Sequence, residues 1–171
     1  GPASTEHLGS EFLVKFLRQR MKSAKIVIMV DSGSDTVFVA ATAERCFDVA
    51  SNFEQYPEWA KDVKEATVLT RDAQGRPHTV EYRASALGRS THYTLEYDYS
   101  KAPHALSWHL VDGDIMRSLR GAYSFNADGT GTRVAYDLAV ELVIPLPGFV
   151  KRRAEMRILS TLKELKTRSE S

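Results

Sequence analysis

The sequence has little cysteine and no long apolar run. Its 171 residues include one cysteine, Cys46, which excludes an internal disulfide and a zinc site built from several cysteines. No uninterrupted apolar run is longer than five residues, as at residues 26–30, whereas a membrane-spanning helix needs about 20 residues. We therefore expect a protein that neither crosses a membrane nor requires an oxidising compartment, and we predict a cytoplasmic location.

An excess of charge of one sign is also missing. Lys and Arg number 23 and Asp and Glu number 22, which gives a net charge of +1. This balance gives no general electrostatic reason to expect nucleic acid as a partner. The charge is nevertheless unevenly distributed, because residues 1–30 carry a net +3 and residues 31–171 carry a net −2. The beginning of the chain therefore differs in character from the rest.

The first residues look like additions to a natural protein. Residues 1–2 resemble the remnant of a cleaved tag, and residues 9–12 resemble two cloning sites read in frame. Apolar residues at helical spacing follow, namely Leu13, Phe16, Leu17 and Met21. A helix with this apolar face and a basic opposite face suits a membrane surface or a partner, or is vector-derived sequence that packs where it can. We assign residues 1–35 to a vector-derived or flexible leader and residues 36–171 to one domain.

The domain begins with one strand and a short helix, and a series of strands follows. Residues 36–41 are rich in β-branched and aromatic residues, and Thr42 is a good N-cap for a short helix that Pro57 interrupts. From residue 63 to residue 142 the apolar residues recur at every second position, in six segments joined by short turns. This pattern predicts an antiparallel meander with one buried face and one wet face.

The end of the chain has a helical pattern. Residues 149–168 contain neither proline nor glycine and are rich in Lys, Glu, Leu and Arg, which predicts an amphipathic helix about 30 Å long. The fold class is therefore α+β. We expect a helix-grip arrangement in which a seven-stranded antiparallel sheet wraps around the long C-terminal helix, with short helices after the first strand.

Large aromatic residues occupy the predicted buried face of the sheet. They are Tyr82, Tyr93, Tyr97, Trp108, Tyr123, Phe125 and Tyr136. Tyrosine and tryptophan carry polar atoms that need partners when buried, and one helix does not fill the space inside seven curved strands. The pattern favours a concave site that orients an apolar ligand through a few polar contacts. The alternative is that these rings simply pack against the helix.

Three segments carry a resemblance to a known family. They are Phe53–Trp59 after the first helix, Leu106–Leu110 in a central strand, and Asn126–Val134 at the last hairpin. Together with the element order, they resemble the START-like superfamily, also called the polyketide cyclase/dehydrase or SRPBCC superfamily. The resemblance covers residues 36–168 and is closest to the actinobacterial cyclase/dehydrase-like proteins and the coenzyme Q-binding branch. It implies an internal cavity under the long helix that binds a lipid, a polyketide, an isoprenoid or another hydrophobic molecule.

Motifs for chemistry are scarce. None of the five histidines lies at metal-ligand spacing, and the sequence has no nucleophile elbow, phosphate loop or dinucleotide fingerprint. The strand alternation places no Asp, Glu or His on the buried face. We therefore expect no metal and no cofactor, and we name no catalytic residue. An enzyme of the cyclase/aromatase type stays open as an alternative, and a protein-interaction module is a second.

The predicted ligand-binding residues come from the sheet and from the long helix. They are Tyr82, Tyr97, Trp108, Tyr123 and Tyr136 on the strands, and Arg153, Met156 and Leu159 on the helix. We expect binding or transport of a hydrophobic small molecule, with the 112–116 turn among the candidate gates. The helix is also rich in Lys and Arg, which suits transient contact with a membrane surface. The oligomeric state is left open.

Overall fold

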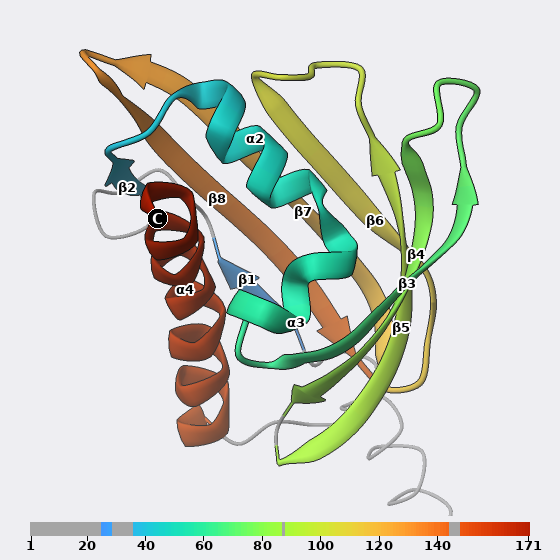
Figure 1. Ribbon diagram of the computed structural model, residues 1–171. Helices are drawn as coiled ribbons and strands as arrows, with labels where there is room; N and C mark the ends of the chain where they lie inside the picture. Colours follow the sequence, from blue (N-terminus) through green and yellow to red (C-terminus); the bar gives the residue numbers. More distant parts are fainter. Residues whose placement is uncertain (1–24, 29–35, 87, 144–147) are drawn as a thin grey trace, which may run out of the picture.

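The strands form one antiparallel sheet that curves around a long helix (Figure 1). The computed structural model describes residues 25–28, 36–86, 88–143 and 148–171, and of residues 25–28, 148–155 and 158 it describes the backbone only. The elements in chain order are β1 (Lys25–Ile28), β2 (Thr36–Val39), α2 (Ala43–Ser51), the 3-10 helix η2 (Phe53–Gln55), α3 (Tyr56–Trp59), β3 (Val63–Arg71), β4 (Pro77–Ala86), β5 (Arg89–Asp98), β6 (Ala105–Gly113), β7 (Met116–Asp128), β8 (Gly131–Leu142) and α4 (Gly148–Glu170).

The predicted α+β helix-grip fold is confirmed. Strands β2 to β8 are the seven expected strands, and the sheet order is β1-β8-β7-β6-β5-β4-β3, with β2 also paired to β8. Strand β1 is an addition that the sequence pattern did not predict. It lies within the segment assigned to the leader and pairs with β8, with Lys25 opposite Glu141. The basic amphipathic segment 13–21 lies outside the described residues.

The short helix after the first strand is capped as the sequence predicts, but it ends at Ser51, and Pro57 begins a second helix instead of interrupting the first. The hydroxyl of Thr42 accepts a hydrogen bond from the backbone N–H of Arg45 at 3.1 Å and so caps the N-terminus of α2. Helix α2 buries Cys46, Val49 and Ala50 and ends at Ser51. Pro57 lies in the first turn of α3, where its missing N–H costs no hydrogen bond. The chain thus turns between α2 and α3 and reaches β3.

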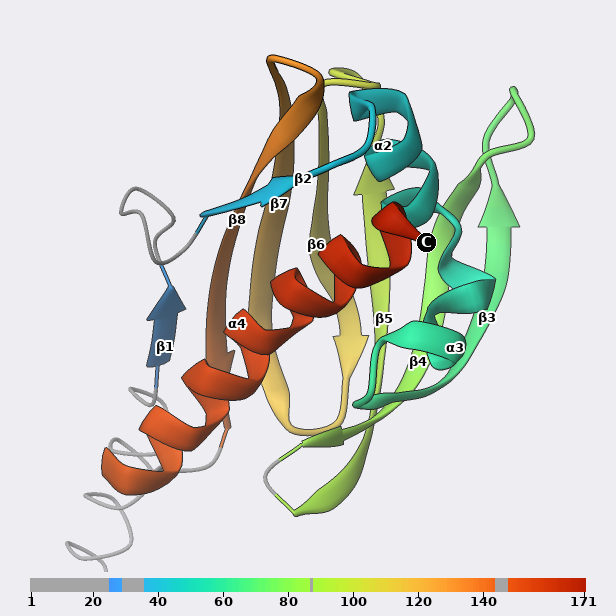
Figure 2. The same cartoon turned by 60° about the vertical axis from the view of Figure 1, so that its left-hand side comes forward.

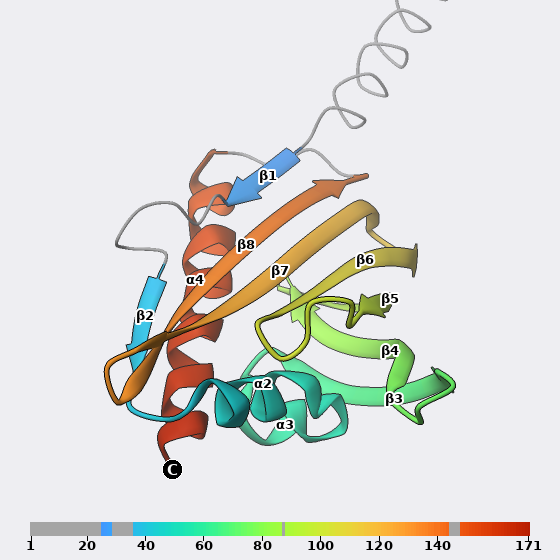
Figure 3. The same ribbon diagram turned by 90° about the horizontal axis from the view of Figure 1, so that it is seen from above.

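The sheet buries alternate residues and bends toward them. Along β8 every second side chain from Thr132 to Leu142 is buried, whereas Arg133 and Asp137 are exposed. Register shifts interrupt the β3–β4, β5–β6 and β7–β8 pairings, and such irregularities increase strand bending and twist. Figure 3 shows the resulting arc of strands, closed on its open side by α2, α3 and α4.

Helix α4 crosses in front of the concave face of the sheet (Figure 2) and is fastened at its C-terminal end. Leu162 and Leu165 are buried there, and the helix contacts α2 and β2. The Glu170 carboxylate accepts the backbone N–H of Ala40 at 2.7 Å, and Lys166 Nζ donates to the carbonyl oxygen of Phe38 at 2.8 Å. The C-terminal half of α4 thus completes the core beside β2, while the N-terminal half runs toward β1 (Figure 2).

Gly131 provides a test of the close packing between β2 and β8. A Cβ atom at this position would overlap the ring of Phe38 and the backbone carbonyl oxygen of Val39. We expect Gly131→Ala to lower the free energy of unfolding by about 1–3 kcal/mol, the usual cost of overpacking, measured by urea denaturation. Gly113→Ala is the control, because its Cβ would meet the flexible end of Leu110 at 3.3 Å. Equal effects of the two substitutions would contradict this account.

Candidate ligand-binding site

A cavity of about 550 Å³ lies between the sheet and α4. Its walls come from the inward faces of β4 to β8, and Arg157 and Thr161 contribute from α4. Gly88 and Ile115 line it from the β4–β5 and β6–β7 connections, next to Ala86 at the end of β4 and Met116 at the start of β7. Both connections lie at the lower end of the sheet in Figure 1. The volume is in the range of small-molecule sites.

Aromatic rings form the central part of the cavity wall. Trp108, Tyr123 and Tyr136 contact one another with ring centroids 4.8–6.1 Å apart, the spacing of favourable aromatic pairs. The indole of Trp108 lies against Gly121 on β7, where any Cβ atom would overlap it. Gly121 therefore gives the indole room to lie flat on the sheet and leaves the cavity open.

The tyrosine hydroxyls divide into paired and unpaired groups. Tyr82 and Tyr97 share a hydrogen bond of 2.6 Å between their hydroxyl oxygens, and the Tyr56 hydroxyl donates to the carbonyl oxygen of Ala50. By contrast, the hydroxyls of Tyr93, Tyr123 and Tyr136, which also line the cavity, make no hydrogen bond within the part of the chain that the structure describes. Their oxygen atoms are not fully buried, so a molecule in the cavity can reach them. These three groups are free to bond a ligand.

Burial keeps the cavity tyrosines neutral. It raises the pKa of Tyr56, Tyr82, Tyr97 and Tyr136 well above the ordinary value, because an oxyanion loses its hydration there, and neighbouring tyrosines raise it further. Burial also raises the pKa of Tyr93 and Tyr123. None of these phenols is a general base near neutral pH.

An ion pair lies on the cavity lining beside α4. Arg157 Nε donates to Asp62 Oδ2 at 3.1 Å, and the guanidinium lies 3.7 Å from Glu164. Glu164 also accepts the backbone N–H of Lys61 at 3.0 Å. The sequence pattern predicted no acidic residue on the cavity lining, and Asp62 corrects it. Asp62 comes just before β3, in a connection whose side-chain direction the strand alternation does not determine.

The β6–β7 connection is held against β5 by Asp114. Its carboxylate accepts hydrogen bonds from the Thr91 hydroxyl, from the backbone N–H of His92 at 3.0 Å and from that of Ile115 at 2.7 Å. Burial opposes ionisation, but these hydrogen bonds outweigh it and lower the pKa of Asp114. Ile115, which is 4% exposed, is thereby held on the cavity lining.

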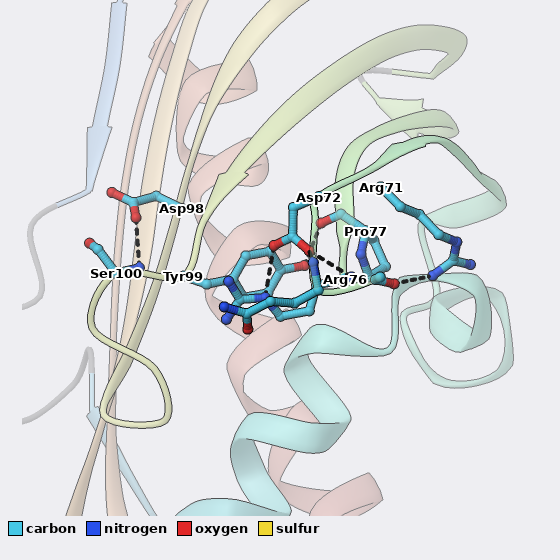
Figure 4. A network of polar contacts seen from close by, with 9 residues as sticks. Arg71, Asp72, Arg76, Pro77, Asp98, Tyr99 and Ser100 are labelled. Atoms are coloured by element: carbon cyan, nitrogen blue, oxygen red, sulfur yellow. Dashed lines mark hydrogen bonds and ion pairs between the residues drawn. The ribbon is translucent and has the colours of Figure 1, made fainter.

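Another polar network lies at the β3–β4 turn (Figure 4). The Asp72 carboxylate accepts hydrogen bonds from Arg76 Nε at 2.8 Å and from the backbone N–H of Arg76 at 2.9 Å. The Arg76 guanidinium lies 4.5 Å from the centre of the Tyr99 ring, and the Tyr99 hydroxyl donates to the carbonyl oxygen of Pro77. These contacts tie the turn to β5. None of the four residues lines the cavity.

The structure places the predicted ligand-binding residues in different surroundings. Tyr82, Tyr97, Trp108, Tyr123 and Tyr136 all line the cavity. On α4, Met156 is 71% exposed and Leu159 packs against the core, and neither is on the cavity lining. The side chain of Arg153 lies outside the described residues. The helix instead contributes Arg157 and Thr161, which a pattern of apolar residues could not reveal. Contact of any of these side chains with a ligand stays a prediction.

The described residues contain no group of histidine, cysteine, aspartate and glutamate side chains that could hold a metal ion. The free cysteine, Cys46, is buried, and burial raises its thiol pKa.

Within the same ranges, no helix combines the length and the apolar character that a membrane span requires.

Comparison with known proteins assigns the chain to a family. Residues 32–170 match the family described as polyketide cyclase/dehydrase and lipid transport, and the chain belongs to it. The START-like superfamily assignment made from the sequence is thereby confirmed. The assignment supports binding of a hydrophobic molecule by this chain. No curated protein matches the chain.

Solved structures of the same fold come from several bacteria. A START superfamily protein from Mycobacterium smegmatis has 27% sequence identity and a TM-score of 0.72, over 85% of this chain and 97% of its own. A protein from Thermus thermophilus has 23% identity and a TM-score of 0.67, over 85% and 96%. The aromatase/cyclase Zhui from a Streptomyces species has 14% identity and a TM-score of 0.68, over 79% and 90%. At these last two identities the likeness concerns the fold alone.

The buried tyrosines are expected to make the folded chain less stable at alkaline pH. All seven have a pKa raised in the folded chain above the ordinary value of 10.0, and that of Tyr99 is about 12. Their stabilising effect is complete below pH 10 and is lost as pH rises toward the folded-state values, because the unfolded chain then releases protons first. We expect the free energy of unfolding to fall by up to about 1.4 kcal/mol per tyrosine per pH unit above pH 10.

Denaturation at pH 8 and pH 11, with tyrosinate absorbance followed at 295 nm, measures this effect. Tyrosinate should appear together with unfolding. Ionisation of most tyrosines near pH 10 in the folded chain would contradict the buried environment.

Asp114 provides a test of the β6–β7 connection. We expect Asp114→Asn to increase hydrogen–deuterium exchange at the amides of His92 and Ile115 by about tenfold, because the amide oxygen of asparagine is a weaker acceptor than a carboxylate. Asp112→Asn is the control, since Asp112 is exposed and lies close to the same connection. If the two variants exchange alike, Asp114 does not hold the connection in place.

Proposed function

We propose that the protein binds one hydrophobic small molecule in its internal cavity and carries it. The observation that supports this proposal is the cavity itself, about 550 Å³ of mainly apolar lining that α4 covers without filling. An ordinary core leaves few voids larger than a water molecule. A space of this size, with three unpaired tyrosine hydroxyls in its wall, suits a ligand far better than it suits packing.

Burial of an apolar ligand would supply the affinity. Removal of apolar surface from water gains about 25 cal/mol per Å². A ligand that buries about 400 Å² therefore gains up to about 10 kcal/mol before the costs of association and ordering. The rigid aromatic wall keeps the ordering cost low, because the stacked rings hold one another in place before the ligand arrives. Lipids, polyketides and isoprenoids are all of suitable chemistry.

Catalysis of the cyclase/aromatase type is the second candidate. The fold similarity to an aromatase/cyclase speaks for it. The cavity lining argues against catalysis. Among the described residues its one carboxylate is that of Asp62, and this carboxylate is paired with Arg157. The other titratable side chains on the described lining, apart from Arg157, are tyrosines, and burial raises their pKa values. We therefore favour binding and transport over turnover.

The cellular setting proposed here is the cytoplasm, with transient contact at a membrane surface. Exposed Met156 lies on α4, shortly after a basic stretch at residues 151–153. An exposed apolar side chain near basic residues suits the surface of an anionic membrane. Such contact would bring the half of α4 nearest the cavity close to a membrane-resident ligand.

Native mass spectrometry of the protein expressed in its natural host tests the proposed function. We expect an added mass of one small molecule per chain, released by organic extraction. Gly121→Ala should reduce the occupied fraction at least fivefold, because the added methyl group drives the Trp108 indole into the cavity.

Ala122→Ser is the matched control, since the alternation of β7 directs residue 122 away from the cavity. No added mass in any preparation, together with no uptake of hydrophobic probes, would overturn the proposal.

A further inference from the structure

The cavity lining carries almost no charge. Among the described lining residues, only Asp62 and Arg157 are charged at neutral pH, and they pair with each other at 3.1 Å. Both side chains are about two-fifths exposed, so the pair belongs to the solvent-accessible margin and not to the interior. Glu164 adds a second carboxylate beside the same guanidinium, at 3.7 Å. Arg157 is therefore already neutralised before any ligand arrives.

The interior is costly for an ion. A carboxylate placed among Tyr82, Tyr97 and Tyr136 would lose its hydration and find no unpaired cation among the described residues around it. Burial of an unpaired charge is strongly unfavourable. The same loss of hydration opposes ionisation of the tyrosines themselves. An anionic ligand would meet the same penalty as a tyrosinate.

The interior is nevertheless not purely apolar. The hydroxyls of Tyr93, Tyr123 and Tyr136 and the indole N–H of Trp108 make no hydrogen bond within the described ranges. A hydrocarbon ligand would leave these groups without partners and so bind less tightly, because a polar group that loses water without gaining a hydrogen bond is unfavourable. A ligand that carries hydroxyl or carbonyl oxygens would pair with them and avoid that cost.

We infer that the cavity selects electrically neutral molecules that carry hydroxyl or carbonyl oxygens, and that it rejects carboxylates of the same shape. The inference rests on the proposed function and adds the chemical class of the ligand. Two features of the site would cause the rejection of carboxylates. The tyrosine-lined interior has no free cation among the described residues, and Arg157 is neutralised by Asp62 and Glu164. The selection is thus electrostatic and does not depend on ligand length.

Three probes that share one ring system test this inference at pH 8. They are 9-anthracenemethanol, 9-methylanthracene and 9-anthracenecarboxylate, whose binding is followed by anthracene fluorescence. We expect the alcohol to bind at least tenfold more tightly than the carboxylate. We also expect it to bind severalfold more tightly than the methyl compound, which cannot pair with the free hydroxyls.

Asp62→Asn shows whether pairing of Arg157 contributes. The substitution releases part of the guanidinium charge, so the alcohol-to-carboxylate affinity ratio should fall at least threefold. Asp137→Asn changes the net charge equally, at an exposed position on the outer face of β8, and should leave the ratio within twofold. Both positions are at least partly exposed, so neither substitution removes core packing.

The outcomes separate the two proposals. Binding of the carboxylate as tightly as the alcohol would overturn the inference and leave the proposed function standing. Failure of all three probes to bind would overturn the inference, and if native mass spectrometry also showed no added mass, the proposed function would be overturned with it. An unchanged affinity ratio in Asp62→Asn would show that Arg157 does not act on the ligand, and would overturn the role given to its neutralisation.

Discussion

The fold depends on how a few helices cover a strongly curved sheet. A twisted antiparallel sheet of this size bends around its apolar face, and that face must be removed from water. Here α2 and the C-terminal half of α4 complete the packing on one side, where Leu165 is fully buried. Phe53 and Tyr56 pack on Tyr97 and Tyr82. Over the middle of the concave surface, however, the described residues supply no second layer of side chains to meet the strands. The cavity is the space that remains, and its wall must remain ordered without a partner across from it.

Large aromatic side chains keep the cavity wall ordered. A wall of leucine and valine facing an open space would lose contacts on one side, whereas Trp108, Tyr123 and Tyr136 contact one another sideways along the sheet. Such lateral contacts hold each ring in place independently of what lies in the cavity. Gly121 completes the arrangement by allowing the indole to rest on the backbone of β7. Order in the wall and openness of the cavity therefore come from the same residues.

The fold, and the part of the site that the strands supply, could be predicted from the sequence because both follow from the alternation of inward and outward side chains along a strand. The alternation of apolar residues from Val80 to Leu142 predicts which side chains face inward. Each of the five aromatic residues predicted on the strands does line the cavity. The helix side was predicted less well. Hydrophobicity selected Met156 and Leu159, but the helix turns its polar residues Arg157 and Thr161 toward the space it covers. Asp62 was missed because it lies in a connection where no periodicity determines the side-chain direction. Strand β1 was missed because a strand of four residues is too short to show an alternating pattern.

The hydroxyl pair of Tyr82 and Tyr97 has a consequence for how the site adapts. The two phenols share one hydrogen bond of 2.6 Å, and either oxygen can be its donor. The hydroxyl that accepts this bond still has its own hydrogen, which is free to be donated elsewhere. Rotation of two hydrogen atoms exchanges these roles while every heavy atom stays in place. The pair thus offers its second hydrogen to a carbonyl from one side or the other, and a lone pair to a hydroxyl. A rigid wall can in this way accept chemically different oxygens by proton rearrangement alone.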